Sequence, residues 1–344
     1  MWPATKKIRV MVVDDSIMAR TMIAQGLGRH SRIEVVGTAI NAQDALAKVG
    51  QYKPDVITSD VEMPGMSGID FLKKLLPQHP LPVILVSSLN LRVFDALQAG
   101  AVDFVRKPEP GQNDIFISSL TQKVLSSAGA KVRRAPAAPV PLGTPRPLGM
   151  RPSLDSVIIG LGASTGGTEA TLEVLKRLPA DIPGMLIVQH MPTGFTQMYA
   201  ERLNRLCQME VREAKHGDEV RRGLALLAPA DYQMRIVRSG TRYTVSVQSG
   251  EKVSGHRPSV DALFFSMAEQ VRCKMVGIIM TGMGRDGADG LLKMRKAGAY
   301  TIGQDKESCV VYGMPMVAQN IGAVQIQASC ENIASVLLRQ LNQL

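Results

Sequence analysis

The sequence predicts an α/β protein with two domains. At 344 residues the chain is longer than one hydrophobic core usually organises, at roughly 150 residues per domain. In both halves, short apolar runs alternate with amphipathic stretches, a pattern typical of parallel sheets covered by helices. A proline-rich stretch separates the halves. We predict a doubly wound, flavodoxin-like domain over residues 1–125, a linker over 126–152, and an α/β sheet domain with a β-hairpin insertion over 153–344.

The basic net charge is concentrated in the predicted linker. The whole chain carries +10, whereas residues 1–125 and 153–344 carry only +2 and +3. The difference comes from Lys131, Arg133, Arg134, Arg146 and Arg151. Six prolines between residues 126 and 152 favour extended, solvated backbone. We interpret the stretch as a linker, and a basic docking site for an acidic partner is the alternative.

Cysteine content and the length of apolar runs indicate a cytoplasmic protein. The four cysteines are widely spaced, form no CxxC pair, and are too few for a disulfide scaffold. No apolar stretch approaches the ~20 residues that a membrane span needs. The apolar run at residues 8–13 is too short for a signal peptide. We therefore expect a cytoplasmic protein without membrane insertion.

Five strands are predicted in the first domain, and acidic residues follow two of them. The strand candidates are residues 8–13, 34–38, 56–59, 83–86 and 103–106. Asp14 and Asp15 follow the first strand, and Asp60 follows the third. The carboxyl ends of parallel strands meet at one sheet edge, where three carboxylates would repel one another without a cation. The pattern predicts a Mg²⁺ site, because this ion prefers oxygen ligands.

Two further side chains complete a site for making an aspartyl phosphate. Ser87, at the end of the fourth strand, offers a hydroxyl group. Lys107, before Pro108, offers an ammonium group to an incoming phosphoryl group. Surface carboxylates with a helix-capping Asp are the structural alternative.

These residues resemble the signature of two-component receiver domains. The matching segments are residues 12–16, 60–68, 86–88 and 107–108. The resemblance implies that a histidine kinase phosphorylates Asp60. It also implies that Asp15, Asp60 and the Glu62 carbonyl bind Mg²⁺, that Asp14 holds a metal-bound water, and that Phe104 is an aromatic switch residue.

In the second domain, three polar residues follow three predicted strands. Ser164 follows the apolar run 156–161, His190 follows 185–188, and Asp286 follows 275–280. A nucleophile, a base and an orienting carboxylate are the groups that acyl transfer needs. Because the strand ends of an open parallel sheet converge on one crevice, we expect the three side chains to meet there.

A dinucleotide-binding site is the competing interpretation of this region. Residues 282–287 match G-x-G-x-x-G between an apolar strand and a helical pattern at 288–297, with Asp305 beyond the next strand. A pyrophosphate at that helix N-terminus would face the carboxylate of Asp286, which would repel it. The fingerprint also normally opens its domain, whereas this copy comes last. We therefore favour a hydrolase over an oxidoreductase.

Ser164 and His190 each have a structural alternative. Ser164 lies in the glycine-rich turn 160–167, which suits a nucleophile on a strand-to-helix turn but also an N-cap serine. Of the five histidines, His190 is the one that directly follows a buried-strand pattern, and a purely structural histidine is the alternative. His256 is a second candidate for shaping the pocket.

Four segments of this domain resemble the catalytic domain of the chemotaxis protein-glutamate methylesterases. They are residues 162–167, 189–192, 256–261 and 280–287. The resemblance implies that the substrate is a glutamate methyl ester on the cytoplasmic helices of a chemoreceptor, and that the same site deamidates certain receptor glutamines. Hydrolysis needs no cofactor, so Mg²⁺ is expected for the receiver alone. The backbone N–H groups of Thr165 and Met283 are expected to hold the oxyanion.

Two expectations concern the remaining surface and the remaining elements. No helix-turn-helix or basic recognition helix stands out after residue 153, so no nucleic-acid partner is expected. The second sheet is expected to be interrupted between about residues 210 and 249 by short alternating strands, with a hairpin turn at 238–242. Helices near 260–270 and 333–341 should cover the sheet.

Overall fold

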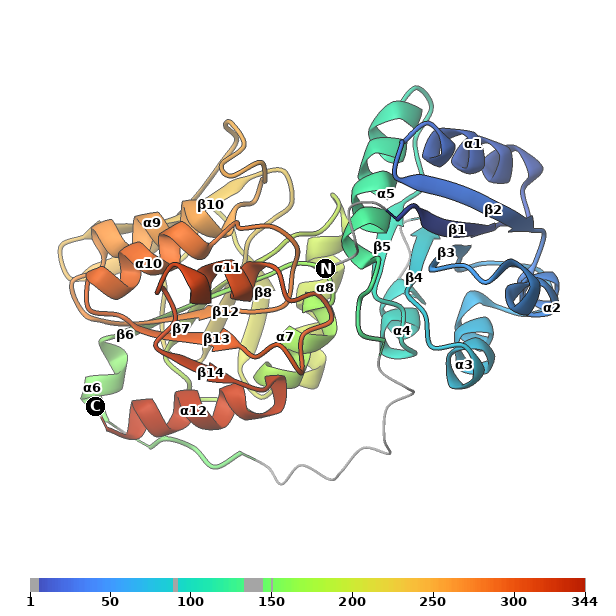
Figure 1. Cartoon of the computed structure of the whole chain (residues 1–344). Helices are drawn as coiled ribbons and strands as arrows, with labels where there is room; N and C mark the ends of the chain where they lie inside the picture. The colour runs from blue at the N-terminus through green and yellow to red at the C-terminus, as the bar shows by residue number, and fades with distance from the viewer. Residues whose placement is uncertain (1–5, 89–91, 133–144, 150, 344) are drawn as a thin grey trace. The chain divides into compact units, whose positions relative to one another are not determined.

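The computed structural model describes residues 6–88, 92–132, 145–149 and 151–343 (Figure 1). The chain divides into two compact units, Met1–Val140 and Pro141–Leu344. This division falls within the predicted linker, at residues outside the described ranges. Each unit is built on its own parallel sheet.

The first unit contains a five-stranded parallel sheet in the order β2-β1-β3-β4-β5. Its strands are β1 (Ile8–Val13), β2 (Ile33–Ala39), β3 (Val56–Asp60), β4 (Val83–Ser87) and β5 (Asp103–Arg106). Each predicted boundary lies within one residue of the observed one. The strand order is that of the flavodoxin-like doubly wound fold, which confirms the predicted fold class.

Helices cover both faces of this sheet (Figure 1). One face carries α1 (Ile17–Gly28) and α5 (Asn113–Ser127), and the other carries α2 (Ala42–Tyr52), α3 (Gly68–Gln78) and α4 (Arg92–Gln98). The side chains of Ser16, Asn41 and Ser67 accept hydrogen bonds from the first turns of α1, α2 and α3, which fixes where these helices begin. Helix α5 ends two residues beyond the predicted domain boundary at 125.

The second unit contains a seven-stranded sheet in the order β14-β13-β12-β6-β7-β9-β8, and neighbouring strands are parallel. Its strands are β6 (Val157–Ala163), β7 (Gly184–Gln189), β8 (Glu210–Glu213), β9 (Leu224–Leu227), β12 (Lys274–Ile279), β13 (Tyr300–Gln304) and β14 (Ile326–Ala328). The chain passes from β6 to β7 on one side and returns as β12 on the other. Such a switch point is where open α/β sheets form a crevice for ligands.

The predicted interruption of this sheet is narrower than expected. β8 and β9 pair in parallel with each other, and β9 pairs with β7, so both extend the main sheet. Within the described residues, the separate antiparallel hairpin comprises β10 (Gln233–Ser239) and β11 (Arg242–Gln248). The sequence did not indicate that β8 and β9 join the main sheet, because their pairing depends on β7, which is distant in the sequence.

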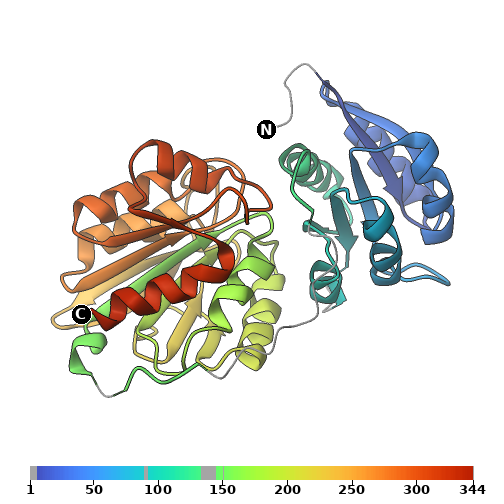
Figure 2. The same ribbon diagram turned by 60° about the horizontal axis from the view of Figure 1, so that its bottom comes forward.

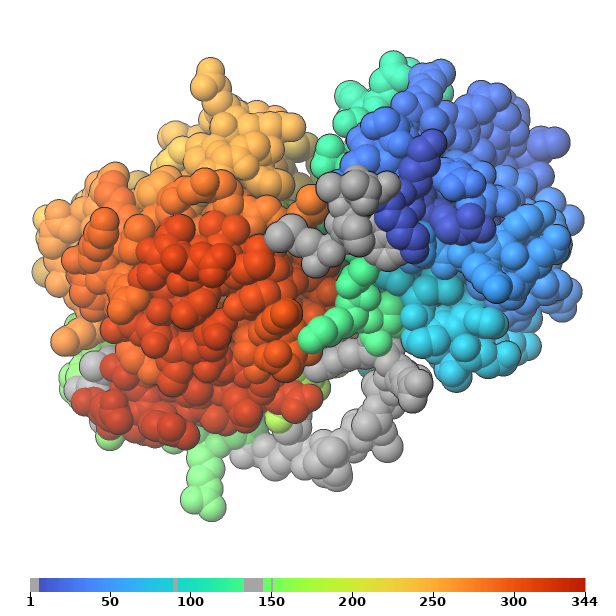
Figure 3. Space-filling model, in the orientation of Figure 1, coloured from blue at the N-terminus to red at the C-terminus, as the bar shows by residue number. Residues whose placement is uncertain are grey.

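Helices also cover both faces of the second sheet. One face carries α9 (Val260–Gln270), α10 (Ala288–Lys296) and α11 (Met314–Asn320), and the other carries α7 (Gly167–Leu175) and α12 (Cys330–Asn342), while α8 (Phe195–Leu206) packs beside β8. Figure 2 shows α12 lying along the sheet, and residues 288–343 cover much of the near face of this unit in Figure 3. A Cβ atom on Gly162 would lie 2.2 Å from Val260 Cγ1, so α9 begins in close contact with β6.

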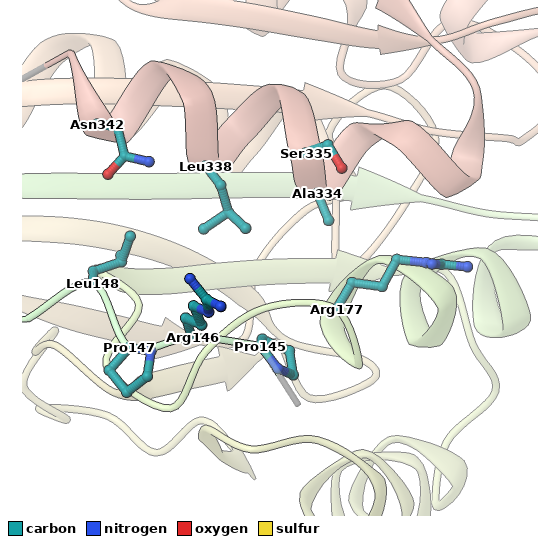
Figure 4. Close-up of a pocket in the computed structure, with 9 residues that line it drawn as sticks. All are labelled: Pro145, Arg146, Pro147, Leu148, Arg177, Ala334, Ser335, Leu338 and Asn342. Atoms are coloured by element: carbon teal, nitrogen blue, oxygen red, sulfur yellow. The ribbon is translucent and has the colours of Figure 1, made fainter. Parts of the chain in front are cut away.

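Residues 145–149, near the end of the predicted linker, pack on the second unit. The short helix α6 (Pro152–Asp155) follows. The N–H groups of Leu148 and Gly149 each donate a 2.9 Å hydrogen bond to the Asp181 carboxylate, and Arg222 binds both Asp181 and the Gly149 carbonyl. A pocket of about 380 Å³ lies between this stretch and α12 (Figure 4). Its lining includes no predicted site residue. Residues 145–149 are therefore held on the protein surface, unlike the freely solvated linker expected.

Candidate active site and candidate phosphoacceptor site

Ser164 lies in the turn between β6 and α7. Its N–H group donates to the carbonyl of Thr281 (2.9 Å), and its carbonyl accepts from the side chain of Gln189 (2.9 Å). The N-cap residue of α7 is Gly166, which adopts a left-handed conformation with φ of 76°. The capping alternative for Ser164 therefore does not hold, and its hydroxyl is not used to cap α7.

His190 follows β7 and bridges the other two predicted residues. Its Nδ1 atom lies 3.2 Å from Ser164 Oγ, and its Nε2 atom lies 2.8 Å from Asp286 Oδ2. An ionised carboxylate can only accept, so the ring proton belongs on Nε2. The lone pair of Nδ1 then faces the serine hydroxyl. The structure thus brings Ser164, His190 and Asp286 together at the ends of three adjacent strands, β12, β6 and β7.

Asp286 is held by the N-terminus of α9. Its Oδ1 atom accepts from Ser259 Oγ (2.7 Å) and from the N–H group of Asp261 (2.9 Å), and Oδ2 accepts from the N–H group of Val260 (2.8 Å). Burial acts to raise the pKa of Asp286, but hydrogen bonding and charge interaction with His190, aided by these donors, outweigh it, so the pKa lies below its usual value. Sequence reasoning missed Ser259, although a serine directly before a predicted helix signals an N-cap.

The G-x-G-x-x-G segment has a structural explanation other than dinucleotide binding. A Cβ atom on Gly282 would lie 2.7 Å from Ser164 Cβ, so glycine permits the loop to approach the serine. Gly287 has φ of 88°, and a Cβ atom there would lie 2.5 Å from Val260 Cγ1. These glycines pack the Asp286 loop against Ser164 and α9.

The remaining predicted residues of this site lie next to Ser164 or His190. Within the described ranges, the N–H groups of Thr165 and Met283 donate to no protein acceptor. Thr165 follows Ser164, and Met283 follows the glycine that contacts it. The ring of His256 stacks on that of His190, with centroids 3.9 Å apart and an interplanar angle of 10°. His256 therefore contacts His190 directly, whereas the sequence suggested only that it shapes the pocket.

The first unit brings the predicted acidic residues together at the carboxyl edge of its sheet. Carboxylate oxygens of Asp14, Asp15 and Asp60 lie within 4.8 Å of one another. Lys107 Nζ lies 2.5 Å from Asp60 Oδ2 and 4.0 Å from Asp14 Oδ2. Asp14 Oδ2 is buried without a hydrogen-bond partner. Burial raises the pKa of Asp14, and Lys107 partly opposes that effect. A buried oxygen in a cluster of carboxylates fits the ligand preference of a hard divalent cation.

The other predicted residues of this site lie on or after β3, β4 and β5. Burial lowers the pKa of Lys107, but its hydrogen bond and ion pair with Asp60 outweigh burial and raise it, so the ammonium group stays charged. The N–H group of Glu62 donates to Asp60 Oδ1 (3.2 Å), and Ser87 is buried with its hydroxyl donating to the Ser88 carbonyl. Phe104 is buried, with its ring edge-on to Phe94 at 6.3 Å.

Comparison with known families follows the same division of the chain. The model of the response regulator receiver domain matches residues 10–118, and that of the CheB methylesterase matches residues 159–337. The chain belongs to the CheB methylesterase family. It is accordingly a carboxylic ester hydrolase that carries a receiver domain, which confirms both predicted resemblances.

Relatives in this family match over nearly the whole chain. A protein-glutamate methylesterase/protein-glutamine glutaminase 2 of Syntrophomonas wolfei is 50% identical over 343 residues, which cover 98% of this chain and 99% of that one. The Escherichia coli protein-glutamate methylesterase/protein-glutamine glutaminase is 44% identical, covering 98% and 97%. The crystal structure of the Thermotoga maritima CheB methylesterase catalytic domain superposes with a TM-score of 0.52 at 33% identity, covering 53% and 97%.

Among the residues that the structure describes, no helix is both long enough and apolar enough to cross a bilayer.

Proposed function

We propose that the chain hydrolyses glutamate methyl esters on chemoreceptors and deamidates certain receptor glutamines, using Ser164, His190 and Asp286 as its catalytic triad. The observation that carries the proposal is the hydrogen-bonded chain from Ser164 Oγ through the imidazole to a buried carboxylate. The substrate class is supported by the names of the relatives, which are methylesterases and glutaminases acting on protein side chains.

The geometry supports one order of events at the serine. His190 Nδ1 accepts the proton of Ser164 Oγ as that oxygen attacks the ester carbonyl, and Asp286 stabilises the resulting imidazolium. The imidazolium returns the proton to the departing methoxy oxygen, and methanol leaves. Water activated by His190 then attacks the acyl-enzyme, which restores Ser164 and yields glutamate. With a glutamine substrate, ammonia leaves in place of methanol.

We assign the oxyanion to the backbone N–H groups of Thr165 and Met283. Both flank the serine, one in its own turn and one in the loop that Gly282 packs against it. Preorganised donors of this kind act where negative charge develops, and each contributes about 3 kcal/mol of transition-state stabilisation in serine hydrolases.

We propose that the receiver regulates this reaction through phosphorylation of Asp60 by a histidine kinase. Asp14, Asp15, Asp60 and the Glu62 carbonyl would hold Mg²⁺, directly or through water, and the ion would neutralise charge on the phosphoryl oxygens. Lys107 and Ser87 would hold those oxygens after transfer, and Phe104 would respond to the movement of Ser87. The reaction takes place in the cytoplasm if the receptor helices are its substrate, with no nucleic acid as a partner.

Methanol release from a methylated chemoreceptor fragment tests the function directly. The full chain should release methanol, and the Ser164→Ala variant should release almost none. Release of methanol by Ser164→Ala would remove the nucleophile assignment. A reactive Ser164 without methanol release would keep the triad and point to a different ester.

A further inference from the structure

A buried glutamine lies near the proposed active site and takes no part in the proposed mechanism. Gln233 is the first residue of β10, and its side chain is buried. Its Nε2 atom donates to the carbonyls of Glu251 (3.1 Å) and His256 (3.0 Å), and its Oε1 atom accepts from the N–H group of Ser259 (2.9 Å). Both amide protons and the carbonyl oxygen are therefore used to bind one loop, residues 249–259.

That loop carries two of the groups that contact the triad. The His256 ring stacks on the base, and Ser259 Oγ donates to Asp286 Oδ1. Gln233 binds the backbone of both residues. Hydrogen bonds therefore connect the hairpin to Ser164 without interruption, through Ser259, Asp286 and His190.

We infer that Gln233 and Ser259 are positioning residues for the triad. Gln233 holds the loop in place by hydrogen bonds to its backbone. The loop in turn orients Asp286 through the Ser259 hydroxyl and His190 through the stacked ring of His256. The inference rests on the proposed function, because it assigns these residues a role in the reactivity of Ser164.

The geometry indicates why loss of these contacts would slow the reaction. Each oxygen of Asp286 accepts two hydrogen bonds, so loss of the Ser259 hydroxyl leaves Oδ1 with one donor and weakens the hold on the orientation of the carboxylate. The Ser164–His190 separation of 3.2 Å is already at the long end of the hydrogen-bonding range. A further shift would weaken the proton transfer, since misplacement by about 1 Å can reduce a rate by roughly 10²-fold.

The test uses a nearly isosteric change with a matched control. Gln233→Glu keeps the shape of the side chain but replaces both amide N–H donors by an acceptor. Gln248 pairs with Gln233 across the hairpin and is exposed, so Gln248→Glu introduces the same charge beside it without cutting the loop contacts. A second pair is Ser259→Ala, which loses the donor to Asp286 and an N-cap, and Ser67→Ala, which loses an N-cap in the first unit.

All variants are made in the full chain, and three quantities are measured. The first is the rate at which a small fluorophosphonate modifies Ser164, which requires no receptor binding. The others are kcat and KM for methanol release. We expect labelling and kcat to fall about 10- to 100-fold in Gln233→Glu and Ser259→Ala, with KM changed less than about twofold. Gln248→Glu and Ser67→Ala should behave as the wild type.

Thermal unfolding separates positioning from simple loss of structure. If Gln233→Glu is unfolded, Ser259→Ala against Ser67→Ala decides the question, since both lose one cap. Wild-type labelling and kcat in folded Gln233→Glu or Ser259→Ala overturn the inference, as does a rise in KM alone. Fluorophosphonate labelling that persists in the Ser164→Ala variant would instead refute the proposed function, because Ser164 would not be the nucleophile.

Discussion

At the scale of single residues, the carboxylate of Asp286 connects His190 to helix α9. It accepts hydrogen bonds from His190 Nε2 and from the N–H group of Val260 at the N-terminus of α9. A helix N-terminus carries partial positive charge, which favours the ionised carboxylate. Asp286 can therefore stabilise a positive charge on His190 without itself being protonated.

The first prediction concerns the three triad residues. Ser164→Ala, His190→Ala and Asp286→Ala should each lower demethylation by about 10³-fold or more, and double variants should lose little beyond the single ones, because the residues act as one unit. Initial rates of methanol release measure this, with circular dichroism as the folding control. Multiplicative losses in the double variants would show that the residues act independently.

The second prediction follows from the lowered pKa of Asp286. A carboxyl group whose pKa is lower in the folded state stabilises the fold above its unfolded pKa, near 4, and this stabilisation is lost as the pH falls through the folded value. Asp286→Asn removes the charge and turns an N–H group toward hydrogen-bond donors. We expect it to cost about 1–3 kcal/mol at pH 7 and progressively less toward pH 3.

Native-state hydrogen exchange of amides in β6 and β12 can follow this difference, because these strands report on the second unit alone. A destabilisation by Asp286→Asn that stays constant between pH 7 and pH 3 would contradict the assigned direction of the pKa shift.

At the scale of elements, the loop between β12 and α10 packs closely against the turn after β6. Glycine at position 282 permits this close contact. The third prediction tests that contact. In Gly282→Ala, the new methyl group would lie 2.7 Å from Ser164 Cβ and 2.4 Å from Met314 Sδ. Overpacking of this kind costs about 1–3 kcal/mol. We expect a lower melting temperature and a displaced Ser164 that reacts more slowly.

Gly28→Ala, in the first unit, is the control, because a Cβ atom there meets no atom within 4 Å and its backbone is not left-handed. Unchanged labelling of Ser164 in Gly282→Ala would show that the loop yields without disturbing the serine, and would weaken the glycine's link to the catalytic geometry.

At the scale of the whole molecule, the connection between the units is shorter than predicted. Helix α5 extends to Ser127, and residues 145–149 are held by Asp181 and Arg222, which leaves at most residues 128–144 to connect the units. A short tether keeps the units at high effective concentration, so even a weak inhibitory association would be populated.

The fourth prediction is that the receiver inhibits the catalytic unit until it is phosphorylated. Deleting residues 1–144, which retains the stretch bound to Asp181, should raise the basal rate of methanol release. In the full chain, Asp60→Ala should keep the basal rate and lose stimulation by a small phosphodonor with Mg²⁺. If the truncated protein is no faster than the unphosphorylated full chain, the receiver must act by recruitment or direct activation.

The sequence by itself determined the fold class, the strands of the first unit and the placement of Ser164, His190 and Asp286 at strand ends. These features were readable because they are local. An apolar run followed by a polar residue marks the end of a buried strand, and in a parallel sheet such ends converge whatever the intervening chain does.

Only the tertiary structure decided which groups contact the proposed triad. Ser259 contacts Asp286 across 27 positions in the sequence, and Gln233 contacts Ser259 across 26. β8 and β9 acquire their direction from β7. A hydrogen bond between distant residues leaves no periodicity in the chain, since neither residue's neighbours are constrained by its partner. The folded sheet and the packing of α9 on β6 create these contacts, so the sequence pattern predicts Ser164, His190 and Asp286 but not the residues that contact them.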